Sequence, residues 1–185
     1  MNYSSVRTLP IAVIALAGML SGAPALAQPS AVPADTVIKL ERTSCFGACP
    51  VYSVTLDGTG AVTYDGVKYV HIVGRQADRV AISRIAAILE AAQRIGFFEL
   101  RDHYRTIENP DGSRTIVTDL PTTIVTITSG GRTKRVEDYL GAPDALKELE
   151  QQIDDIARTR RWIRPEEHIL SDSRPGGARP RRHTP

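Results

Sequence analysis

The sequence lacks the motifs that identify the commonest enzyme classes. It contains no G-x-S-x-G, no H-E-x-x-H, no P-loop and no dinucleotide-binding fingerprint. These absences exclude the usual forms of serine hydrolases, zinc peptidases, P-loop nucleotidases and Rossmann-type oxidoreductases. We therefore expect no catalytic residue, no cofactor and no metal site, and we lean against an enzyme.

Histidine, cysteine and excess charge of either sign are also scarce. The 185 residues include two cysteines and four histidines, and the formal net charge is +2. A charge so near neutral does not indicate binding to nucleic acid. We expect His71 and His103 to be ordinary polar residues. Asp154 and Asp155 are adjacent on a predicted helix, so their side chains point in different directions and do not converge as an acid pair. We expect both on a solvated face.

Only the N-terminus carries a long apolar run. "LPIAVIALAGML" follows the basic Arg7, and Ala25 and Ala27 form a small-x-small cleavage site. This three-part pattern is typical of a secretory signal peptide. The run is shorter than the ~20 residues that span a bilayer. We expect residues 1–27 to be removed, which leaves a periplasmic or secreted protein with no transmembrane segment.

Composition divides the remaining chain into three parts. Residues 28–35, "QPSAVPAD", are predicted to be a flexible leader, and residues 36–163 a single folded domain. Residues 164–185 are rich in Pro, Gly and Arg and nearly free of large apolar residues, which predicts a disordered basic tail. The tail arginines suit either simple solubility or contact with anionic envelope polymers.

Hydrophobic periodicity predicts strands interrupted by two helices. Alternation or β-rich composition favours strands over residues 36–42, 51–57, 61–66, 67–74, 122–129 and 133–139. Helical spacing covers 78–100, with a stop at Gly96, and 141–162. The apolar stripes of these two helices are Ile82, Ile85, Leu89 and Ala92, then Leu146, Leu149, Ile153 and Ile156. The pattern predicts an α+β fold, with one antiparallel sheet of about five or six strands and both helices packed on one face.

Both cysteines lie in "RTSCFGACPVY", residues 42–52. An extended chain would separate the two Cα atoms by about 13 Å, whereas a disulfide needs about 4.4–6.8 Å. Gly47 allows the necessary bend, and an exported compartment favours oxidation. We therefore predict that Cys45 and Cys49 form a structural disulfide.

Two alternatives for this motif remain open. C-x3-C-P resembles the copper-binding motif of Sco-type copper chaperones, and soft thiolates suit Cu(I). A redox-active thiol pair is the other alternative, although its usual spacing is C-x-x-C. Pro50 leads into a strand, so no helix N-terminus is present to lower a thiol pKa.

Several stretches together resemble an uncharacterised family of exported bacterial domains of unknown function. They are "ERTSCFGACPVYSVTLDGTGAVTYDG", "FFELRDHY", "TDLPTT" and "GAPDALKELE". The matched positions are Cys45, Phe46, Gly47, Cys49, Pro50, Tyr52, Asp119 and Pro121. The resemblance implies a one-domain exported protein without assigned activity, cofactor or catalytic residues. With the sequence itself, it favours a non-enzymatic domain that binds a partner in the cell envelope, a protein or a polymer. Asp119 suits either an Asx-type turn or a polar binding site.

Overall fold

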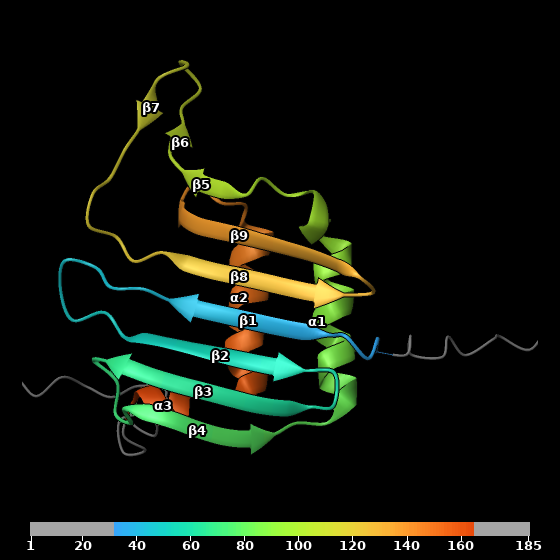
Figure 1. Ribbon diagram of the computed structural model, residues 1–185. Coiled ribbons are helices and arrows are strands. Elements are labelled where there is room, and N and C mark those ends of the chain that lie inside the picture. Colours follow the sequence, from blue (N-terminus) through green and yellow to red (C-terminus); the bar gives the residue numbers. More distant parts are fainter. Residues whose placement is uncertain (1–31, 165–185) are drawn as a thin grey trace, which may run out of the picture.

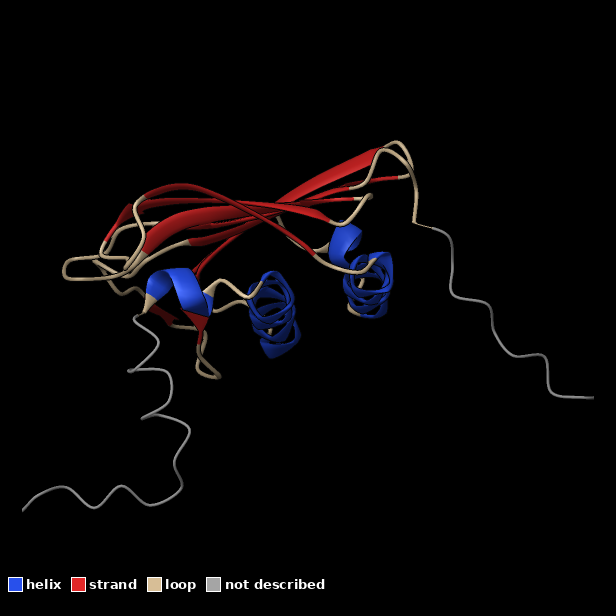
Figure 2. Ribbon diagram, turned by 90° about the horizontal axis from the view of Figure 1, so that it is seen from below, coloured by secondary structure: helices blue, strands red, loops and turns tan. Residues whose placement is uncertain are grey.

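A seven-stranded sheet with helices on one face forms the framework of the protein (Figures 1 and 2). The computed structural model describes residues 32–164. The predicted signal peptide, residues 28–31 of the leader and the tail from residue 165 lie outside the described residues. The strand order is β4-β3-β2-β1-β8-β9-β5, and every neighbouring pair is antiparallel except β5 with β9.

The strands of the main sheet are β1 (Val37–Arg42), β2 (Val51–Asp57), β3 (Ala61–Lys68), β4 (Gly74–Arg79), β5 (His103–Arg105), β8 (Thr123–Ser129) and β9 (Arg132–Leu140). A separate two-stranded ribbon pairs β6 (Ile107–Glu108) with β7 (Arg114–Thr115). The helices are α1 (Ile82–Arg94), α2 (Asp144–Ala157) and the short α3 (Arg160–Ile163), and a 3-10 turn, η1, covers Phe97–Glu99.

The strands bury one face and leave the other uncovered, because successive side chains alternate across a sheet. In β2, Tyr52, Val54 and Leu56 are buried while their neighbours are only half-buried. α1 and α2 lie side by side on the buried face (Figure 2). The predicted arrangement, an antiparallel-dominated sheet with helices on one face, is therefore confirmed.

The first helix begins later than predicted, and its buried face contains partly different residues from the predicted ones. α1 starts at Ile82, which is exposed, and its core face includes Ile88, which the prediction left out. Leu89 is only partly buried. Gly96 has φ +63°, so the predicted left-handed stop is confirmed, and Phe97 directly after it is fully buried.

The second helix buries all four predicted residues, from Leu146 to Ile156. It ends earlier than predicted, at Ala157, where Arg158 takes a left-handed conformation with φ +57°. The chain then turns into α3. Backbone hydrogen bonds from His71 to Ile163 and from Ile72 to Trp162 fix α3 against the β3–β4 loop.

The prediction of five or six strands was too low because the missed strands carry weak signals. β4, "GRQADR", is a polar edge strand without apolar alternation, and β5 has three residues. Residues 69–73, predicted to be part of a strand, form the loop between β3 and β4. This loop puts the Ile72 carbonyl so near Gly66 that a Cβ there would lie 2.2 Å from its oxygen, so only glycine fits.

Some residues of the leader contact the domain. Both carboxylate oxygens of Asp35 accept hydrogen bonds from the backbone N–H groups of Gly130 and Gly131 in the β8–β9 turn. Within residues 32–164, no helix has both the length and the apolar character to cross a bilayer.

Candidate functional site

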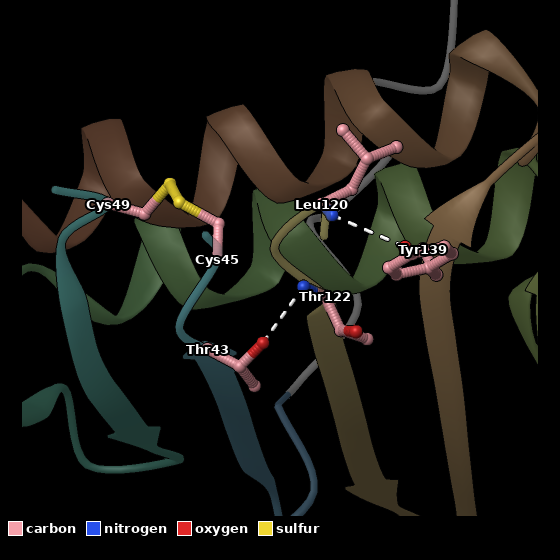
Figure 3. The surroundings of a disulfide bond; sticks show 6 residues. All are labelled: Thr43, Cys45, Cys49, Leu120, Thr122 and Tyr139. Carbon is pink, nitrogen blue, oxygen red and sulfur yellow. Dashed lines mark hydrogen bonds between the residues drawn. A yellow bond between two sulfur atoms is a disulfide. The ribbon is translucent and has the colours of Figure 1, made fainter. Parts of the chain in front are cut away.

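The two segments that hold the matched motif positions, residues 45–52 and 119–121, lie side by side in the structure (Figure 3). The backbone N–H of Phe46 donates to the carbonyl of Asp119 at 3.1 Å. Thr43 and Thr122 add two bonds: Thr43 N–H donates to the Thr122 carbonyl, and Thr122 N–H donates to Thr43 Oγ1. Residues more than 70 positions apart in sequence thus form one pair of loops.

These loops lie at the end of the sheet where β1 and β3 finish and β2 and β8 begin, on the left in Figure 1. We call this the motif end and define it as residues 43–50, 67–75, 105–122 and 158–164. Backbone hydrogen bonds join these segments in two pairs: Phe46 bonds to Asp119, and the β3–β4 loop bonds to α3.

Cys45 and Cys49 form the predicted disulfide. Their Cα atoms are 5.8 Å apart, within the range that a bridge requires. The chain therefore folds back between them, and Gly47 N–H donates to the Cys45 carbonyl in that bend. With the sulfurs bonded to each other, neither is a thiolate ligand for Cu(I) in this state.

Asp119 shapes its loop through the backbone. Its φ is +70°, a left-handed conformation that Asp tolerates better than most residues. On either side of it, Tyr139 of β9 holds the chain. Its hydroxyl donates to the Val117 carbonyl at 2.7 Å, and it accepts from Leu120 N–H at 3.2 Å (Figure 3). The Asp119 side chain is exposed.

Phe46 is the motif residue with a large apolar side chain in solvent: it is 90% exposed, whereas the other aromatic motif residue, Tyr52, is buried. Its backbone is held from both sides, by the disulfide and by Asp119. The ring therefore projects from a fixed loop and contributes nothing to the core.

A groove of about 870 Å³ opens on the helix side of the motif end. Cys49, Pro50, Tyr52 and Pro121 form its sheet-side wall, together with Thr123. The opposite wall comes from the end of α2 and from α3. Five arginines contribute to the lining: Arg42, Arg158, Arg160, Arg161 and Arg164.

The base of the groove is a buried ion-pair network centred on Asp154, whose residue exposure is 8%. One carboxylate oxygen accepts from the hydroxyls of Tyr52, at 2.8 Å, and Thr159, at 2.7 Å. The other accepts from Arg42 Nε at 3.3 Å and Nη2 at 2.9 Å. All four acceptor positions of this carboxylate are therefore occupied.

Arg42 extends the network to a second acidic residue of α2. Its Nη1 donates to Thr123 Oγ1 at 2.8 Å and lies 3.7 Å from Glu150 Oε2. Glu150 is only 4% exposed, and its Oε1 has no hydrogen-bond partner. Burial, together with the charge of Asp138, raises the pKa of Glu150 to about 7, although Arg42 opposes the rise.

Tyr52 connects the network to the aromatic core. Burial raises the pKa of its phenol, and the Asp154 carboxylate adds to that rise. Tyr52 therefore remains protonated and serves as a donor. Its ring lies 5.6 Å from that of Tyr64, which stacks on Trp162 of α3 at 4.8 Å.

Sequence reasoning identified the loops of this site but not its charged base. The prediction of a solvated face was wrong for Asp154 and right for Asp155, which is exposed. One signal was present: Glu150 and Asp154 follow the buried Leu146 at spacings of four, so all three share one row of the helix. His71 and His103 are exposed, and His103 contacts Glu137. Within residues 32–164, no group of His, Cys, Asp and Glu is arranged to hold a metal ion.

Replacing Cys45 and Cys49 together by serine should lower the free energy of unfolding by about 2 kcal/mol, because the unfolded chain loses the constraint of the closed loop. The melting temperature should fall by roughly 4–8 °C for a domain of this size. Thermal unfolding followed by circular dichroism measures the change. A bridge with a structural role should also resist mild reductant. Two titratable thiols in the native protein would indicate the redox alternative instead. Binding of one equivalent of Cu(I) by the parent but not by the double variant would indicate the copper alternative.

Glu150 should make the protein less stable as the pH rises. Its folded-state pKa, about 7, exceeds the ordinary value of 4.5. The stabilisation from binding this proton is therefore fully present below about 4.5 and is lost as the pH rises through about 7. Chemical denaturation at pH 5 and pH 8 tests this. Between pH 5 and pH 8, the free energy of unfolding of Glu150→Gln should rise by about 2 kcal/mol relative to that of the parent.

Glu148→Gln provides the control for that experiment, since Glu148 is exposed on the same helix. Its free energy of unfolding should change with pH as that of the parent does. An equal shift in both variants, or no shift in Glu150→Gln, would mean that Glu150 does not titrate in this window.

Comparison with known proteins shows the family to which the chain belongs. No curated protein matches the chain. A family model described as "Domain of unknown function (DUF6438)" matches residues 36–157, which include both motif loops, the Cys45–Cys49 pair and nearly all of the sheet and its helices. The chain therefore belongs to the DUF6438 family, whose domain is one of unknown function.

Proposed function

We propose that the chain is an exported, non-enzymatic binding domain of a bacterial cell envelope, with the motif end as its binding surface and the disulfide as a structural element. Export is supported by the signal-peptide pattern of residues 1–27. It is also supported by the disulfide, since such bonds persist mainly in oxidising compartments outside the cytoplasm.

The observation that carries the binding role is the exposed ring of Phe46 on a restrained backbone. The Phe46 ring packs on no part of the core, so the stability of the core does not require it. Held by a disulfide and by Asp119, it loses little conformational freedom on contact with a partner. Such rigid, exposed aromatic side chains suit recognition.

The polar residues beside this surface suit a structural role better than catalysis. Every acceptor position of Asp154 is used within the protein, so it has none left for a substrate proton. Tyr52 stays protonated and donates to Asp154. The network therefore fixes the helices beneath the loops and leaves recognition to the loops themselves.

Fractionation of cells that make the full chain tests the export part of this proposal. We expect the protein outside the cytoplasm, with Gln28 as its first residue and with no thiol that reacts with an alkylating reagent before reduction. N-terminal sequencing and mass spectrometry give both results. An intact chain beginning at Met1 in the cytosol, with two alkylated cysteines, would overturn the proposal.

A further inference from the structure

Exposed apolar side chains gather at the motif end. Among the described residues, nine large hydrophobic side chains are exposed, and seven of them lie within the motif end. These seven are Phe46, Val67, Tyr69, Val73, Ile107, Ile116 and Val117. The other two, Val37 and Ile82, lie at the opposite end of the sheet, where β1 and α1 begin. The antiparallel topology therefore places the segments that carry these side chains at the same end of the sheet (Figure 1).

Positive charge is concentrated at the same end. Residues 32–164 contain 18 Lys and Arg and 18 Asp and Glu, so the described part of the chain is neutral overall. The motif end has eight basic residues and only three acidic ones, Glu108, Asp111 and Asp119. The basic residues are Lys68, Arg75, Arg105, Arg114, Arg158, Arg160, Arg161 and Arg164. Arg158 and Arg161 pair with the nearby Asp78, Arg105 with Glu137 at 3.0 Å, and Arg114 with Glu108 at 4.0 Å. With Asp78 and Glu137 counted, this end still has eight basic residues against five acidic ones.

We propose that the motif end docks on the surface of an anionic lipid bilayer, with Phe46 and the neighbouring apolar side chains entering the interface and the arginines facing lipid phosphates. This rests on the proposed use of the motif end as a binding surface and adds the identity of the partner. Basic residues around apolar tips complement an anionic membrane in both charge and polarity.

The shape of this end favours a bilayer over a protein partner. The apolar side chains project from three separate segments, the β1–β2 loop, the β3–β4 loop and residues 105–122. A protein partner would need a matching hollow for each projection, whereas a bilayer deforms around them. Aromatic side chains such as Phe46 and Tyr69 suit the boundary between water and hydrocarbon. Tyr69 also lies beneath the Lys68 ammonium, 4.6 Å from the ring centre.

Sedimentation with vesicles tests the proposal with the full chain as cells produce it, so the result does not depend on the export experiment. We expect binding to vesicles of equal phosphatidylglycerol and phosphatidylcholine, little binding to pure phosphatidylcholine, and weaker binding as salt is raised. Phe46→Ser should reduce the partition coefficient about tenfold, since it removes one inserted aromatic side chain. Ile82→Ser is the matched control and should bind as the parent does.

A second variant reports insertion directly. The chain has one tryptophan, Trp162, which is buried, so it adds a nearly constant background. In Phe46→Trp, the added indole should shift its emission to the blue on anionic vesicles and be quenched by brominated lipid.

Three results would overturn the proposal: no binding of the parent to anionic vesicles, equal loss in Phe46→Ser and Ile82→Ser, or an unshifted Phe46→Trp spectrum. A concentration-dependent dimer that Phe46→Ser abolishes, without vesicle binding, would assign the surface to a second copy of the chain instead.

Discussion

The buried carboxylate of Asp154 is the interaction on which the motif end depends. Its partners come from three different parts of the chain: Arg42 at the end of β1, Tyr52 near the start of β2, and Thr159 before α3. A buried charge is tolerated only when it is paired and hydrogen-bonded. The carboxylate therefore holds the C-terminal part of α2 at one place over the sheet, because any displacement would leave a charge without partners.

The visible features of the motif end are built on this network. Tyr52 follows the disulfide loop by three residues, so the bond to Asp154 fixes the point at which the loop rejoins the sheet. Thr159 lies between α2 and α3, so the same carboxylate helps to set the direction of α3 and the position of its arginines. Through Arg42, the network also reaches Thr123 at the start of β8, immediately after the Asp119 loop. Loops that are far apart in sequence are thus stabilised by one ion-pair network, and the disulfide restrains only the tip of the β1–β2 loop.

The sequence was most informative where one residue type has one strong structural preference. Gly96 stops α1 in a left-handed conformation, and Leu146, Leu149, Ile153 and Ile156 mark the buried face of α2, as their spacing indicates. Cys45 and Cys49 are bridged because the three residues between them, with a central glycine, can bring them within bonding range. The polar β4 and the three-residue β5 could not be predicted, since their pairing comes from the neighbouring strand rather than from their own residues.

The burial of Asp154 and the exposure of Phe46 were harder to predict, for a different reason. An acidic residue on an amphipathic helix is usually solvated, and only its partners in three dimensions show that Asp154 is buried while Asp155 is not. Likewise, phenylalanine is usually buried, but the structure turns the ring of Phe46 into solvent. The long-range pairs that decide both cases, Arg42 with Asp154 and Phe46 with Asp119, join segments whose contact no local pattern specifies.

If Asp154 supports the whole motif end, its replacement by asparagine should destabilise the protein far more than the same replacement of Asp155, and the free energies of unfolding of the two variants measure this difference. Both substitutions remove one negative charge from the same turn of α2, but only Asp154 has buried partners. We expect the free energy of unfolding to fall by about 3 kcal/mol or more for Asp154→Asn and to change by less than about 0.5 kcal/mol for Asp155→Asn. Equal and small effects of the two substitutions would contradict this role of Asp154.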